Sequence, residues 1–148
     1  MVKETGRDCI VCVRSEQRNA DGEKQIIEVR SKGRLSEREG VLYVLYTENM
    51  DENGTGESAE VRNLLKIEKR SGWAEIRKSG AVSWKMRFEQ GRTGTQMYTT
   101  PFGALEICTE TKSVSVITEQ KKTSLQLIYA LLIEGEKQAD CRLEIEIF

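Results

Sequence analysis

Hydrophobic and polar residues alternate along most of this chain. Residues 141–147 alternate strictly between apolar and charged, and residues 84–89 follow the same pattern. Residues 125, 127, 129, 131 and 133 place five apolar side chains on one face of a longer segment. No segment keeps the helical period of about 3.6 residues over three turns. A period of two places successive side chains on opposite faces, so the pattern predicts strands with one buried and one solvated face, as in antiparallel sheets.

Short polar or glycine-containing stretches separate these segments at hairpin-like spacing. The expected strands cover residues 7–17, 24–36, 41–48, 60–70, 73–79, 82–90, 95–100, 104 to about 118, 125–133 and 141–147, with polar loops at 49–59 and 134–137. Residues 109–112 contain no Gly, Pro or Asn, so the pattern leaves open a turn there or one long bent strand. We therefore expect about nine or ten strands.

The only proline of the chain, Pro101, stands between two of the expected strands. Proline lacks an N–H group and fixes φ at about −65°, so it cannot lie inside a hydrogen-bonded central strand. It also favours an extended conformation at Thr100, and Gly103 follows two residues later. The group predicts a tight turn.

So many antiparallel strands in one chain of 148 residues leave sheet edges that must be protected. Closure into an up-and-down barrel removes them most completely, and we expect residues 1–148 to form a single barrel domain of about 8–10 strands, with a β-sandwich as the alternative. Residues 41–46 are apolar on both faces, which fits an inner face lining the barrel and an outer face covered by a terminal segment or a second copy.

Composition excludes several classes of function. The net charge of −1 and the pI near 5.7 are wrong for binding nucleic acid through its phosphates. The longest apolar run, residues 127–133, is far shorter than the ~20 residues of a membrane helix. The N-terminal residues show no signal peptide. We expect a cytoplasmic protein, monomeric or homodimeric, that binds neither nucleic acid nor membranes.

The chain contains no histidine, which removes the usual general base and the commonest metal ligand. Cys9 and Cys12 have zinc-like spacing, but on a strand residues three apart face opposite sides, and Cys108 and Cys141 are isolated. Residues 51–57 have the oxygen donors of a calcium loop, but Arg62 replaces its closing glutamate. We expect no metal, no cofactor and no catalytic residues.

Four residue groups, in order, carry a resemblance to a known family: Val41-Leu42-Tyr43-x-x-Tyr46-x-Glu48, Ile76-Arg77-x-Ser79-Gly80-Ala81, Met86-x-Phe88-x-x-Gly91 and Tyr98-x-Thr100-Pro101-Phe102-Gly103. Over nearly its whole length the chain resembles the YwiB-like family of uncharacterised bacterial proteins. The resemblance implies a calycin-type, lipocalin-like β-barrel in the bacterial cytoplasm, with a domain of unknown function. Phe102 stands where the family more often has tyrosine, which removes a hydroxyl group.

Small barrels have interiors that are filled by side chains or hold one small ligand. The candidate ligand-binding residues are Arg77, Trp84, Tyr98 and Thr100, near one mouth. An inward Arg77 would bind a carboxylate or phosphate, but a buried Ile76 would place Arg77 outside, since neighbours on a strand face opposite sides. The first interpretation is a small-molecule binding barrel. The alternatives are a structural or protein-interaction barrel with a filled interior and, last, an enzyme that works without histidine.

Overall fold

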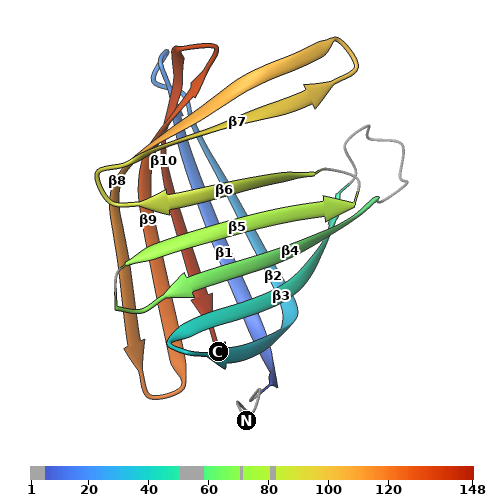
Figure 1. Cartoon of the computed structure of the whole chain (residues 1–148), viewed down its shortest axis with the longest axis vertical. Coiled ribbons are helices and arrows are strands. Elements are labelled where there is room, and N and C mark those ends of the chain that lie inside the picture. Colours follow the sequence, from blue (N-terminus) through green and yellow to red (C-terminus); the bar gives the residue numbers. More distant parts are fainter. Residues whose placement is uncertain (1–5, 51–58, 71, 81–82) are drawn as a thin grey trace.

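The computed structural model describes residues 6–50, 59–70, 72–80 and 83–148. Ten strands and no helix lie in these ranges (Figure 1). The strands are β1 (Arg7–Asn19), β2 (Lys24–Arg38), β3 (Val41–Met50), β4 (Ala59–Glu68), β5 (Trp73–Gly80), β6 (Trp84–Glu89), β7 (Thr93–Thr100), β8 (Gly103–Glu119), β9 (Lys122–Ile133) and β10 (Glu136–Ile147). The described part of the chain accordingly has no helix able to cross a membrane.

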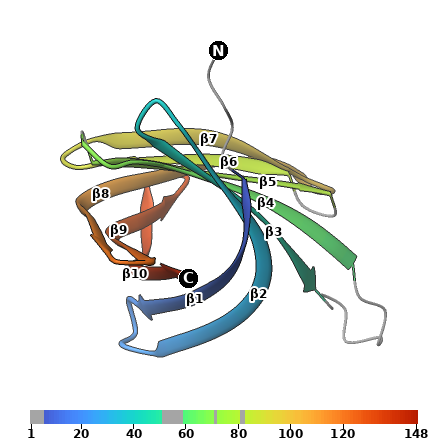
Figure 2. The ribbon, with the colours of Figure 1, turned by 90° about the horizontal axis from the view of Figure 1, so that it is seen from below.

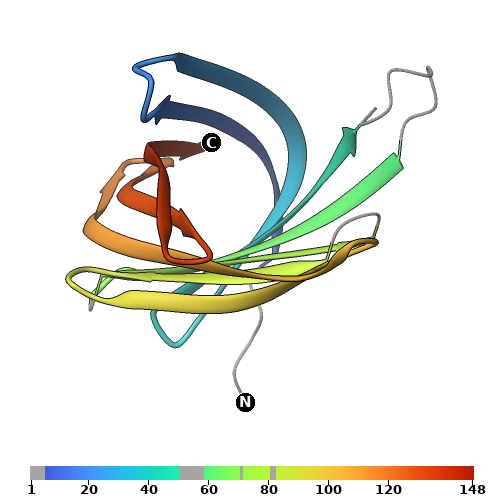
Figure 3. The ribbon, with the colours of Figure 1, turned by 90° about the horizontal axis from the view of Figure 1, so that it is seen from above.

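All ten strands belong to one antiparallel sheet, in the order β6-β5-β4-β3-β2-β1-β10-β9-β8-β7. Strands that follow one another in the chain pair with one another, except β6 and β7, and the first strand also pairs with the last. Seen along its axis, the sheet curls into a ring that brings β6 and β7 side by side (Figures 2 and 3). The predicted antiparallel up-and-down barrel is confirmed, and the alternative β-sandwich is not formed.

The ring is not completely closed, because β6 and β7 share no ladder of peptide hydrogen bonds. A side chain connects them instead: the backbone N–H of Lys85 in β6 donates to Oε1 of Gln96 in β7, at 2.9 Å. At one end the turn after β6 is attached to β8, where Gly91 N–H donates to Thr111 O and Thr111 N–H donates to Arg92 O, each at 3.0 Å. We call the boundary between β6 and β7 the seam.

Residues 109–112, whose conformation the sequence left open, lie within one long strand. β8 runs from Gly103 to Glu119 and pairs with β9 from Ile107 to Glu119. Its register shifts between Thr111 and Ser113, which is a β-bulge at Lys112. A bulge bends a strand without interrupting the sheet, so the long bent strand is the correct alternative.

The turn predicted at the proline is present. Thr100 pairs with Gly103, so Pro101 and Phe102 form a two-residue connection between β7 and β8. Gly103 has a φ of 123°, a conformation that only glycine adopts without strain. Phe102 is 99% exposed at the tip. Of the loop expected at 49–59, residues 51–58 lie outside the described residues, and these include the calcium-like residues 51–57. Residue 81, between the strands expected at 73–79 and 82–90, also lies outside them.

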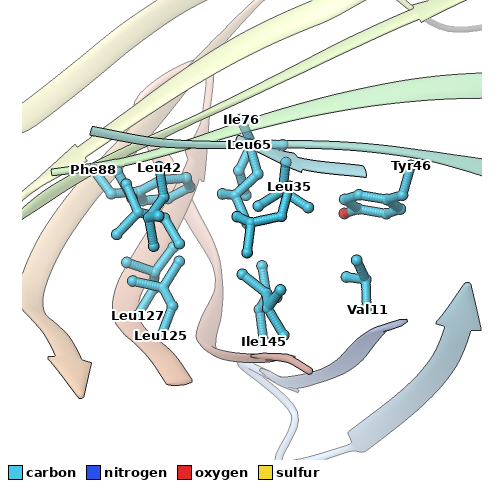
Figure 4. Close-up of a cluster of buried hydrophobic side chains, with 14 of the residues drawn as sticks. Val11, Leu35, Leu42, Tyr46, Leu65, Ile76, Phe88, Leu125, Leu127 and Ile145 are labelled. Atoms are coloured by element: carbon cyan, nitrogen blue, oxygen red, sulfur yellow. The ribbon is translucent and has the colours of Figure 1, made fainter. Parts of the chain in front are cut away.

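One end of the barrel interior is filled by apolar side chains (Figure 4). Three cross-strand neighbours, Val44, Leu65 and Ile76, form a continuous buried row from β3 to β5, and Met86 extends it into β6. Side chains from β1, β9 and β10 close the core from the opposite wall: Val11, Leu125, Leu127 and Ile145. This half of the barrel is a solid hydrophobic core.

The outer face of β3 is less covered than its sequence predicts. Leu45 is 55% exposed, and Tyr43 is half-buried, with the Lys66 ammonium 5.8 Å from the centre of its ring. Within the described chain, no terminal segment shields Leu45 from solvent.

Replacing Leu65 with alanine is expected to lower the free energy of unfolding by about 2–5 kcal/mol, because its side chain is fully buried and a cavity would remain. Leu45→Ala, on the outer face of the adjacent strand, is the matched control and should cost less than about 1 kcal/mol. Urea unfolding followed by circular dichroism measures both. Equal losses in the two variants would contradict the position of the core.

Replacing Gln96 with alanine removes the side chain that joins β6 to β7. We expect a loss of about 1 kcal/mol in unfolding free energy, and faster hydrogen exchange at the Lys85 amide, because its acceptor is gone. Exchange measured by NMR tests this, with Gln25→Ala on exposed β2 as the control. Unchanged exchange at Lys85 would show that the seam is held by other contacts.

Candidate ligand cavity in the barrel

The other end of the barrel interior is hollow. A cavity of about 220 Å³ lies among side chains of β1, β2, β3, β5, β6, β9 and β10. A second cavity of about 250 Å³ lies behind the seam, among side chains of β6, β7, β8 and β9. We call them the mouth cavity and the seam cavity. Trp84 and Tyr129 line both, so the two cavities adjoin across this aromatic pair of residues.

The mouth cavity opens where β2 separates from β3. The ladder between the two strands begins at Arg38 and Val41 and stops at Gly33 and Tyr46. Gly33 allows a close approach there, since a Cβ atom in its place would stand 2.8 Å from the carbonyl oxygen of Leu45. Beyond this point β2 curves away from β3 (Figure 1), and Glu48 follows on the interior face of β3.

A polar and aromatic row crosses the sheet immediately above the apolar core. Tyr46, Asn63, Lys78 and Trp84 are cross-strand partners on β3, β4, β5 and β6. Each stands two residues along its strand from a member of the buried apolar row, so each shares the interior face. The interior therefore changes from apolar to polar within a single pleat, at the floor of the mouth cavity.

Glu48 organises the charges of this row. Its Oε1 atom accepts a hydrogen bond from Asn63 Nδ2 at 2.9 Å and an ion-paired hydrogen bond from Lys78 Nζ at 3.1 Å. The two charged side chains are only 18% and 20% exposed, and Asn63 is 1% exposed. The Lys78 ammonium also stands 5.7 Å from the centre of the Trp84 ring, within the range of a cation–π contact. Partly buried charges are costly unless paired, and here each is paired.

Aromatic rings form the wall between the cavities. Tyr129 packs against Phe88, with ring centroids 4.8 Å apart and planes tilted by 52°, a favourable arrangement for two aromatic rings. Phe88 lines only the seam cavity, together with other largely apolar side chains of β6, β8 and β9. The seam cavity is thus the more apolar of the two.

Burial keeps the hydroxyl groups of Tyr46 and Tyr129 and the thiol of Cys141 protonated. Burial raises the pKa of Tyr46, and the nearby charge of Glu48 raises it further. Burial also raises the pKa of Tyr129, with a further increase from Cys141. The pKa of the Cys141 thiol rises to about 11 because burial outweighs the lowering effect of its hydrogen bond with Tyr129. These groups are suited to hydrogen bonding and packing, and not to proton abstraction near neutral pH.

The structure brings two of the four residues proposed from sequence to one site. Trp84 and Tyr98 both line the seam cavity. Thr100 lies at the end of β7, two residues beyond Tyr98, and its side chain lies outside the described residues. Arg77 is exposed on the outer face of β5, because Ile76 is buried in the core and neighbouring residues face opposite sides. Arg77 therefore does not line either cavity.

Sequence reasoning missed the roles of Lys78 and Asn63. Both stand in phase with buried apolar residues, Lys78 two positions after Ile76 and Asn63 two before Leu65. The available signal was a polar or charged residue at a position that the alternation assigns to the buried face of a strand.

Cys9 is buried in the core, whereas Cys12, three residues on, lies on the other face of β1, as the strand pattern predicts. All four cysteines are free thiols. Within the described ranges no three His, Cys, Asp or Glu side chains stand close enough together to hold a metal ion.

These features define a class: a small antiparallel up-and-down β-barrel, solid at one end and hollow at the other. The model of the family described as "Domain of unknown function (DUF1934)" matches residues 11–145, and the chain belongs to this family.

A relative from Bacillus subtilis (strain 168), the "Uncharacterized beta-barrel protein YwiB", is 27% identical over 118 residues, which are 80% of this chain and 78% of the relative. The crystal structure of ywiB protein from Bacillus subtilis has a TM-score of 0.74 to this chain at 24% identity, over 95% of this chain and 92% of that one, so the two share a fold. The membership of the YwiB-like family predicted from sequence is confirmed.

Replacing either partner of the Glu48–Lys78 pair with methionine should lower the free energy of unfolding by about 1–3 kcal/mol, because the other charge loses a hydrogen-bonded partner. The double variant should lose less than the sum of the single ones, giving a coupling energy of at least about 1 kcal/mol in a double-mutant cycle.

The matched control is the Glu37–Lys69 pair on the outer surface, 2.9 Å apart and more exposed, where the same cycle should give less than about 0.5 kcal/mol. Similar coupling energies for the two pairs would argue against a special environment at Glu48.

Proposed function

We propose that this protein binds a small molecule in the hollow end of its barrel. The observation that carries the proposal is the adjoining pair of cavities, of about 220 and 250 Å³, on opposite sides of Trp84 and Tyr129. Binding sites for small molecules are typically concave, mostly apolar and provided with a few convergent polar groups. The mouth cavity supplies Glu48 and Lys78, and the seam cavity supplies the apolar surface.

The distribution of polar residues inside the barrel supports this function over a purely structural one. A barrel built only for rigidity has no need of a charged pair in its interior, since apolar side chains of the same volume are usually as stabilising. Here the apolar filling stops at the row of Val44, and charged residues begin two positions later. The alternative function, a structural or protein-interaction barrel, expects an interior filled with side chains throughout. Only the core end of this barrel is filled in that way.

Binding without catalysis is the favoured form of the function. The buried tyrosines near the cavities have pKa values raised away from neutrality, and the chain contains no histidine. We also propose that the protein works in the cytoplasm, as its four free cysteines suit a reducing compartment.

Titration with N-phenyl-1-naphthylamine, a neutral dye that brightens in apolar surroundings, tests the proposal. We expect saturable binding of one dye per chain, because the seam cavity is apolar and enclosed by four strands. Leu131 lines this cavity, so Leu131→Trp should fill it and weaken dye binding by at least about tenfold.

Leu45→Trp adds the same ring to the exposed outer face and serves as the control, with thermal unfolding checking that both variants fold. Dye binding that both variants leave at the wild-type affinity would mean that the dye binds elsewhere, and the proposed function would fail.

A further inference from the structure

Resting on the proposed binding function, we infer the chemical class of the ligand: a neutral molecule with a flat aromatic body and a carboxamide-type head group, in which an N–H donor stands beside a C=O acceptor. The head group lies against the Glu48–Lys78 pair in the mouth cavity. The aromatic body lies beside Trp84 and Tyr129 and extends toward the seam cavity.

The charges of the mouth cavity select a neutral head group. Lys78 Nζ and Glu48 Oε1 are 3.1 Å apart, so any group that meets one of these charges also meets the other. An anionic head group attracted by Lys78 would approach the Glu48 carboxylate, and a cationic head group attracted by Glu48 would approach the Lys78 ammonium. In each case the repulsion offsets the attraction, and the ligand also loses the hydration of its charge.

A paired positive and negative charge acts as a local dipole, and its natural complement is an opposed dipole. A carboxamide directs its C=O group at the ammonium and its N–H group at the carboxylate, and it has no net charge to desolvate. The mouth cavity thus favours a group with adjacent donor and acceptor atoms over a single charge of either sign.

Glu48 also keeps an acceptor atom for a ligand donor. Both hydrogen bonds that Glu48 receives within the described chain go to its Oε1 atom, which leaves Oε2 as an acceptor. Asn63 donates its Nδ2 group to Glu48, while its buried Oδ1 atom has no donor in the described structure. A ligand N–H that binds Glu48 at Oε2 would add a hydrogen bond to this network, whereas Asn63 lies outside the cavity lining and its Oδ1 atom takes no part in ligand binding.

The aromatic body follows from the wall between the cavities. Trp84 and Tyr129 are the two side chains common to both cavities, and a flat ring stacks on such residues with a favourable geometry. The further walls of the seam cavity are apolar, from Met86, Phe88 and Ile107. They suit a hydrocarbon ring and not a second polar group.

Four probes with the same aromatic body and different head groups test this inference by isothermal titration calorimetry: 2-naphthamide, 2-naphthoate, 2-naphthylmethylammonium and 2-methylnaphthalene. We expect 2-naphthamide to bind at least about tenfold more tightly than each of the other three. A tenfold difference in affinity is about what one hydrogen bond contributes in a partly buried site.

In the Glu48→Met, Lys78→Met double variant, the preference for 2-naphthamide over 2-methylnaphthalene should fall to about twofold or less. The Glu37→Met, Lys69→Met variant removes a comparable ion pair from the outer surface and should keep the full preference. Thermal unfolding confirms that each variant is folded at the temperature of the titration.

The outcomes separate this inference from the function on which it rests. Tighter binding of the anion or the cation, or equal binding of all four probes, overturns the ligand class while leaving a binding barrel. Binding of none of the probes, together with dye binding that Leu131→Trp does not weaken, overturns both.

Discussion

The pairing of the first strand with the last is the interaction on which the rest of the structure depends. β1 and β10 form a continuous antiparallel ladder from Val11 and Ile147 to Asn19 and Ala139. Without it the chain would form two separate meanders, β1 to β6 and β7 to β10, each with one apolar face exposed to water. With it, the apolar faces of both meanders turn inward onto a common axis, and burial of these faces supplies the main driving force for folding.

That closure also determines where the cavities lie. Side chains from β1 and β10, such as Val13 and Leu143, face Lys78 and Tyr46 from the opposite wall only because the ring is joined there. At the core end, large apolar residues on both walls meet across the axis. At the mouth end, β2 has left β3 and the residues on β1 become smaller and more polar, as at Ser15, so the walls do not meet and space remains.

Much of this fold could be predicted from the sequence. Alternation predicted the strands, and glycine-containing turns such as Glu134-Gly135, where both residues have positive φ, marked their ends. The bulge at Lys112 could not be predicted, because nothing in its own sequence distinguishes it from regular strand; the pairing with β9 creates it. The seam was equally hidden, since closure depends on the accumulated twist of ten strands and not on any local pattern.

The candidate site could be predicted only in part. Trp84 and Tyr98 stood out as aromatic residues on amphipathic strands, and they share a cavity. The Glu48–Asn63–Lys78 network joins three strands whose relative register is fixed by the barrel, and register is a property of pairing that a single sequence does not display. The alternation along β5 is enough to place Lys78 on the interior face of the barrel. Only the register between strands places it opposite Trp84 and beside Glu48.

At the seam, side chains take the place of peptide hydrogen bonds between two neighbouring strands. Along each ladder of the sheet, neighbouring strands are held at a fixed spacing by peptide hydrogen bonds, which have to break before the strands separate. Between β6 and β7 the link is the Gln96 side chain, and the ladders on either side, β5 with β6 and β7 with β8, do not depend on it. The width of the cavity behind this boundary is therefore set by side-chain packing and not by the fixed geometry of a peptide ladder.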